Sequence, residues 1–134
     1  MNLFNDIRTL VIDSLAAMTA AGELPPGLDT SAVAVELPRD PAHGDMATNA
    51  AMVLAKPAGL NPRAIADGLA SRLRGDARIV SADVAGPGFL NLRLFPSVWQ
   101  SVVHATLLET GGYGRSRLGA GQKVNVEFVS ANPT

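Results

Sequence analysis

Hydrophobic residues recur every three or four positions in three segments of the chain, which predicts three amphipathic helices. We expect these helices over residues 2–21, 62–74 and 96–110, since each is bounded by glycine, proline or asparagine residues suited to a helix terminus. Residues 46–56 are rich in alanine and methionine and predict a short buried helix that Pro57 closes. The apolar stripes of the three periodic helices are Leu3, Ile7, Leu10, Val11, Leu15 and Met18, then Ile65, Leu69 and Leu73, then Val98, Val102 and Leu107.

Hydrophobic residues alternate with polar ones in four other segments, which predicts strands. These are residues 33–37, 77–84, 89–94 and 124–128, and the second and third are joined by a glycine-bearing turn at 85–88 that suits a hairpin. Helices and strands in mixed order favour an α+β fold of two layers, with the helices on one face of a small antiparallel sheet. The other face of the sheet is then open.

The end of the sequence differs from the rest. Residues 111–122 contain five glycines with two arginines, which is typical of a linker. A lone strand and the turn-opening Asn132-Pro133 follow. We therefore expect a first domain over residues 1–110, a linker over 111–122, and the start of a second, truncated domain over 123–134, loosely attached because a single strand is marginal.

Composition narrows the class of protein. A 134-residue chain that is 47% hydrophobic can bury a core, and the lack of cysteine excludes a disulfide framework and cysteine-ligated metal sites. No apolar run approaches the roughly 20 residues of a membrane span, and the N-terminus is not a signal peptide. We expect a cytoplasmic location and no membrane partner.

The net charge of −1 hides an uneven distribution. Residues 1–45 hold seven acidic and two basic residues, and residues 46–134 hold five acidic and nine basic ones, so the two parts carry −5 and +4. A mildly basic part is compatible with a polyanionic partner, but it is far below the basic charge of an independent nucleic-acid binder. Charge alone favours ordinary surface scatter over a polyanionic partner.

The predicted strand at 89–94 carries the most chemical information. Leu90, Leu92 and Leu94 should point into the core, because successive side chains alternate between faces. Phe89, Asn91 and Arg93 then share the open face, and a ring to stack on, an amide to read an edge and a guanidinium for a phosphate would suit an unpaired nucleobase. In the alternative interpretation Phe89 packs under a helix and Asn91 only caps the turn.

The other polar motifs favour structural roles. The Gly-Pro-Gly at 86–88 lacks the spacing of a phosphate-binding loop. Asp45, beside His43, is expected to cap a helix that begins there. His104 has no ligand-type partner one turn away, so we expect no metal site. Near the end of the chain the carboxylate of Glu127, the hydroxyl of Ser130 and the amide of Asn132 could hold an ammonium group.

Several motifs together resemble the start of a bacterial arginyl-tRNA synthetase. The resemblance runs along most of the chain and is most specific at its end, where glutamate, serine and Asn-Pro-Thr occur together. The residues that carry it are His43-Gly44-Asp45, Thr48-Asn49-Ala50-Ala51, Leu54-Ala55-Lys56, Gly86-Pro87-Gly88-Phe89-Leu90-Asn91 and residues 126–134, Val-Glu-Phe-Val-Ser-Ala-Asn-Pro-Thr.

The resemblance implies that residues 1–110 are the additional N-terminal domain of that family, which recognises the D-loop of the arginine tRNA through Phe89, Asn91 and Arg93. It implies that Glu127, Ser130 and Asn132 line an arginine pocket. It also implies that the ATP-binding signature begins with Ala131, Asn132, Pro133 and Thr134.

The His-Ile-Gly-His signature and the later lysine loop of the family are absent from the chain. We therefore expect this chain alone to be inactive, with no catalytic residue of its own, and to be a monomer. The full enzyme would join arginine to its tRNA through an arginyl-adenylate, with ATP and magnesium.

Two other hypotheses remain open from the sequence. A protein-interaction module without a nucleic-acid role would fit the net charge near zero, and it predicts an open sheet face dominated by apolar side chains. A small stand-alone enzyme has little support, because the sequence places no nucleophile beside a base and no cluster of metal ligands.

Overall fold

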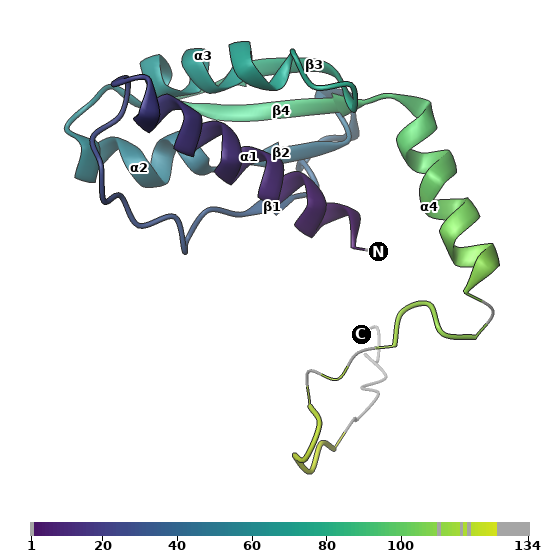
Figure 1. Ribbon diagram of the computed structural model, residues 1–134. Coiled ribbons are helices and arrows are strands. Elements are labelled where there is room, and N and C mark those ends of the chain that lie inside the picture. The colour runs from purple at the N-terminus through teal and green to yellow at the C-terminus, as the bar shows by residue number, and fades with distance from the viewer. Residues whose placement is uncertain (1, 110, 116, 118, 126–134) are drawn as a thin grey trace, which may run out of the picture.

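The structure, a computed structural model, describes residues 2–109, 111–115, 117 and 119–125. Within these residues, helices and a four-stranded sheet form two layers, and the last helix points away from them (Figure 1). This confirms the predicted α+β class. The elements are α1 (Leu3–Ala20), β1 (Val35–Glu36), the 3-10 helix η1 (Pro41–His43), β2 (Met46–Thr48), α2 (Ala50–Ala58), α3 (Pro62–Leu73), β3 (Ile79–Ala85), β4 (Phe89–Leu94) and α4 (Pro96–Leu108).

The sheet has the strand order β1-β2-β4-β3, and every neighbouring pair is antiparallel. β3 and β4 form the predicted hairpin, and α2 and α3 connect β2 to β3 across the sheet. Strand β4 lies in the interior of the sheet, where Leu92 pairs with Met46 of β2 and with Ala82 of β3. The leucines of β4 therefore form the centre of the buried face.

One hydrophobic core fills the space between the helices and the sheet. Helices α1, α2 and α3 each place an apolar stripe on the buried face, because their hydrophobic residues return at helical spacing. Asn61 begins α3 as predicted, since its side chain accepts a hydrogen bond from the Arg63 backbone at 2.8 Å. The largest fully buried side chains are Ile7, Val11, Val33, Met46, Thr48, Leu54, Ile65, Leu69, Leu73, Leu90 and Leu92.

The predicted helix over residues 46–56 is wrong at its start. Met46, Ala47 and Thr48 form strand β2, and helix α2 begins only at Ala50. Alanine and methionine favour helices, but here pairing with β1 and β4 overrides that preference. Three residues are too few for a period of two to be visible in the sequence.

The expected role of Asp45 as a helix cap is also wrong. Its backbone N–H donates to the Leu92 carbonyl at 2.8 Å, and its carboxylate accepts the Leu94 N–H at 2.7 Å. The segment therefore continues the β2–β4 ladder instead of starting a helix. Gly44 allows the close approach, because a Cβ atom there would lie 2.7 Å from the Leu92 carbonyl oxygen, and its φ of +132° disfavours other residues.

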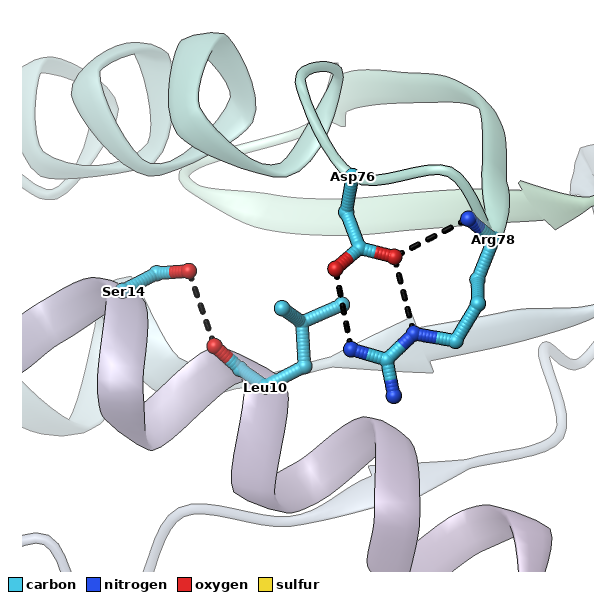
Figure 2. A network of polar contacts seen from close by, with 4 residues as sticks. All are labelled: Leu10, Ser14, Asp76 and Arg78. Carbon is cyan, nitrogen blue, oxygen red and sulfur yellow. Dashed lines mark hydrogen bonds and ion pairs between the residues drawn. The ribbon is translucent and has the colours of Figure 1, made fainter.

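A carboxylate–guanidinium pair holds the turn between α3 and β3 (Figure 2). Asp76 accepts from the Arg78 side chain at 2.8 and 2.9 Å and from its backbone N–H at 2.9 Å. The Arg78 hydrogen bond lowers the pKa of Asp76, and Asp76 raises the pKa of Arg78, with weaker contributions from Asp6 and Asp13 of α1. In the same view the Ser14 hydroxyl donates to the Leu10 carbonyl within α1, at 2.8 Å.

The segment after α4 has no helix or strand in its described residues, which are exposed. The predicted strand at 124–128 lies mostly outside the described residues, and Lys123, Val124 and Asn125 are in no strand. Among the helices that the structure describes, none combines the length and the apolar character needed to cross a membrane.

The contact of Gly44 with β4 makes a prediction about stability. Gly44→Ala should lower the free energy of unfolding by about 2–4 kcal/mol, because the new methyl group meets a backbone carbonyl and the positive φ is strained. Gly22→Ala is the matched control, since Gly22 has a φ of +77° with no heavy atom within 4 Å. It should cost only about 1 kcal/mol. Urea unfolding followed by circular dichroism measures both, and equal losses would show that the close approach is unimportant.

The Asp76–Arg78 pair makes a prediction about pH. Because the folded pKa of Asp76 is lowered, its stabilisation is present above the ordinary carboxyl pKa of 3.8 and is lost as pH falls through the folded pKa. Asp76→Asn should cost about 0.5–1 kcal/mol near neutral pH, a figure held low by the partial exposure of Arg78. The difference from wild type should shrink below about pH 4, whereas the exposed control Asp67→Asn should change little at any pH. A cost of Asp76→Asn that is independent of pH would contradict this assignment.

Candidate functional site

A cavity of about 500 Å³ lies on the open face of the sheet. Its floor is formed where Ala47 of β2 and Ala85 of β3 place only methyl groups beside Asn91 and Phe89 of β4. Two small side chains among larger ones leave a hollow that no helix covers. The residues that line it are Ala34, Glu36, Leu37, Pro38, Arg39, His43, Ala47, Asn49, Ala85, Gly86, Phe89 and Asn91.

The first wall of the cavity is strand β4 with the turn before it. Phe89 is 43% exposed, and Asn91 is half-buried between Ala47 and Asp83 of the neighbouring strands. Phe89 is therefore not packed under a helix, contrary to the alternative interpretation of this strand. Gly88 fixes the turn against α3, because a Cβ atom at Gly88 would lie 2.8 Å from Pro62.

The second wall is the segment from Glu36 to His43, which joins β1 to β2. The predicted strand over residues 33–37 is shorter in the structure, since β1 ends at Glu36, and Leu37 is 70% exposed at the rim of the cavity. The segment is held at one end by Asp45 on β4 and by Arg93, whose Nη2 donates to the Ala42 carbonyl at 3.4 Å. An exposed leucine and an exposed phenylalanine thus line one cavity from two different walls.

Hydrogen bonds from Thr48 of β2, from Asn49 before α2 and from α1 hold residues 32–34, which lie just before β1 and the second wall. The Asn49 amide accepts the Ala34 N–H at 2.8 Å and donates to the Ala32 carbonyl at 3.3 Å. The hydroxyl of Thr48 donates to the Ala34 carbonyl at 2.8 Å. On the other side, Arg8 donates to the Val33 carbonyl at 2.7 Å. The chain is therefore tied down on both sides just before it enters the second wall.

The side chains around the cavity form a mixed set. Phe89 and Leu37 supply apolar surface, Arg39 and His43 supply positive or titratable groups, and Glu36 supplies a carboxylate. Within the part of the chain that the structure describes, the side-chain amide of Asn91 makes no hydrogen bond, so its donor and its acceptor are both available. Such a set suits a flat ring with a polar edge that is attached to an anion.

The structure brings together two of the three residues predicted for a nucleobase. Phe89 and Asn91 line the cavity, and Arg93 is exposed on the same face but is not among the lining residues. Sequence reasoning missed Leu37, Arg39 and His43 as parts of the cavity. The sequence does show a leucine before a proline and a basic residue, next to a polar loop. Whether this segment contacts β4, however, depends on the order of the strands in the sheet.

The other predicted sites are not built by the described residues. Glu127, Ser130, Ala131, Asn132, Pro133 and Thr134 lie outside them. No cluster of three or more potential metal ligands occurs among the residues that the structure describes. His104 is exposed on α4.

Two comparisons with known proteins, one with a family model and one with individual relatives, point to the same family. A family model described as the arginyl tRNA synthetase N terminal domain matches residues 5–94. Over its whole length the chain is 74% identical to an arginine–tRNA ligase of Cereibacter sphaeroides, 72% identical to one of Paracoccus denitrificans and 69% identical to one of a Ruegeria species. It spans 23% of the length of each of these relatives. A family match over most of the chain, together with these identities, shows that the chain belongs to the arginyl-tRNA synthetase N-terminal domain family.

Proposed function

We propose that this chain is the tRNA-binding N-terminal domain of an arginine–tRNA ligase, and that its open sheet face receives an unpaired base from the D-loop of the arginine tRNA. The observation that carries the proposal is the cavity at Phe89 and Asn91. The family membership supports the tRNA as the partner. The D-loop comes from the resemblance noted in the sequence.

The chemistry of the cavity supports a nucleotide as its ligand. A base that leaves its stack needs an apolar plane, which the exposed ring of Phe89 offers, and a partner for its edge, which the free amide of Asn91 offers. The sugar-phosphate chain of the same nucleotide is anionic, and Arg39 and His43 line the cavity beside it. Arg93, exposed on the same face, would contact an adjacent phosphate.

The composition of the open face argues against the alternative of a protein-interaction module. That hypothesis predicted a face dominated by apolar side chains. Although Phe89 and Leu37 are apolar, most of the other strand residues on this face are polar or charged, so the face is not uniformly apolar; two of them are acidic, so the case for a nucleic-acid ligand rests on the cavity itself. These polar or charged residues are Glu36, Ser81, Asp83, Asn91 and Arg93.

By the same proposal, the full-length protein attaches arginine to its tRNA in the cytoplasm. It activates arginine with ATP and magnesium as an arginyl-adenylate. The residues described here bind and orient the tRNA and contribute no group to that chemistry. Glu127, Ser130 and Asn132 would belong to the arginine pocket, and Ala131 to Thr134 would begin the ATP-binding signature.

Removing either contact with the base should weaken recognition. In the full-length ligase, Phe89→Ala and Asn91→Ala should each lower kcat/KM for the arginine tRNA. The loss should correspond to about 1–3 kcal/mol of transition-state stabilisation, the amount that one base stack is worth. Phe4→Ala is the matched control, because Phe4 is an exposed phenylalanine of α1 outside the cavity. Aminoacylation kinetics measure the effect. If the double variant Phe89→Ala, Asn91→Ala charges the tRNA like wild type, the base-binding proposal is wrong.

The basic residues should contribute through phosphate contacts. Arg39→Gln or Arg93→Gln should weaken tRNA binding and reduce the slope of log Kd against log salt by ~1 each, since each removes one released counterion. Lys56→Gln is the control, because Lys56 is exposed on α2 and outside the cavity. Titrations at several salt concentrations give the slopes. Unchanged slopes in both arginine variants would exclude phosphates from this side of the cavity.

A further inference from the structure

Helix α4 is apolar over more of its circumference than the rest of the domain covers. Val98 is buried and Val102 is half-buried, and these two residues face the domain. On another side of the helix Trp99, Val103 and Leu107 recur every four residues and are 38%, 59% and 70% exposed, so the predicted stripe of Val98, Val102 and Leu107 is wrong at Leu107, which lies opposite Val98. Because residues four apart lie above one another on a helix, these three side chains form one continuous stripe.

The exposure of the stripe increases along the helix because only the first turns of α4 touch the domain. There a smaller cavity of about 340 Å³ is lined by Val98 and Ser101 of α4, by residues of α1 and by Arg78, which precedes β3. Farther on, α4 extends away from the two layers (Figure 1). At the 100° per residue of an α-helix, Gln100 lies at the border of the stripe, and His104 lies about 100° around the axis from Val103, the middle of the stripe.

Such a helix is poorly suited to stand in water by itself. Thirteen residues form α4, and isolated helices shorter than about 12–15 residues are marginal in water. Helices in folded proteins gain most of their stability by packing an apolar face. A row of large exposed hydrophobic side chains is typical of a surface that another protein part covers.

The position of α4 in the chain indicates what covers it. The N-terminal domain model matches residues 5–94 and therefore ends just before α4 begins at Pro96. The relatives continue far beyond this region, since the chain spans only 23% of their length. If this protein continues as these relatives do, helix α4 lies between the N-terminal domain and the rest of the protein. The glycine-rich residues 111–122 that follow would allow the chain to reverse direction.

We propose that the stripe of Trp99, Val103 and Leu107 docks on the domain that follows in the full-length protein. A domain tethered by a short segment is present at an effective concentration of about millimolar, which favours it over a second copy of the chain. Docking of the helix fixes the orientation of the N-terminal domain relative to the domain that follows. The cavity on the open sheet face then points in one direction. This inference shares one assumption with the proposed function, namely that the protein continues as its relatives do.

Hydrogen exchange on the full-length protein tests the docking. Leu107→Asp and Val103→Asp should each speed the exchange of the α4 amides at least about tenfold, because a charge in the contact favours the open, undocked helix. His104→Asp is the matched control, since it places the same side chain on the same helix but about 100° around the axis from Val103, and it should leave the exchange of α4 unchanged. Small-angle scattering should show a larger radius of gyration for the first two variants only.

Each outcome decides the proposal. Leu107 is 70% exposed at the far end of α4, so Leu107→Asp should leave the amides of the sheet protected even if Val103→Asp disturbs the fold. Equal acceleration in all three variants, or none in any, would overturn the proposal. Protection of α4 in wild type that disappears on dilution would instead assign the stripe to a second copy. Since neither measurement involves tRNA, a failure here is distinct from a failure of base binding.

Discussion

The close approach of Gly44 and Asp45 to strand β4 is the constraint on which the site depends. The Asp45 N–H and carboxylate bind the Leu92 carbonyl and the Leu94 N–H, and the missing side chain of Gly44 makes room for this contact. The three residues of β2 gain a fixed position between β1 and β4. The preceding segment, from Glu36 to His43, is then held beside β4 as the second wall of the cavity.

Small residues on the open face then determine where the cavity lies. Ala47 and Ala85 flank the two β4 residues that carry the chemistry, Asn91 and Phe89. A larger side chain at either alanine would fill the hollow, whereas a methyl group leaves the ring and the amide accessible. The buried face of the same strand is filled by Leu90 and Leu92, so one strand serves both the core and the site. The rigidity of the site thus follows from the packing beneath it.

Much of the fold and part of the cavity could be predicted from the sequence, and each wrong or missing prediction has a physical reason. The helical stripes of α1 and α3 and the alternation of β4 were readable because each repeats over several turns or residue pairs. Strand β2 was not, since three residues cannot show a period and their preference for helix is overridden by pairing. Phe89 and Asn91 were found because they alternate with leucines, whereas Leu37, Arg39 and His43 reach the cavity through sheet order, which sequence pattern does not give.

The proposed binding of one unpaired D-loop base in the cavity at Phe89 predicts an energetic coupling between that base and the ring. A double-mutant cycle measures this coupling. Each D-loop nucleotide of the arginine tRNA is made abasic in turn, and the affinity of each tRNA is measured for the full-length wild type and for Phe89→Ala. At one position the two changes should be strongly non-additive, because removing the base leaves the ring nothing to stack on. Additive effects at every D-loop position would mean that Phe89 stacks on no base of the D-loop.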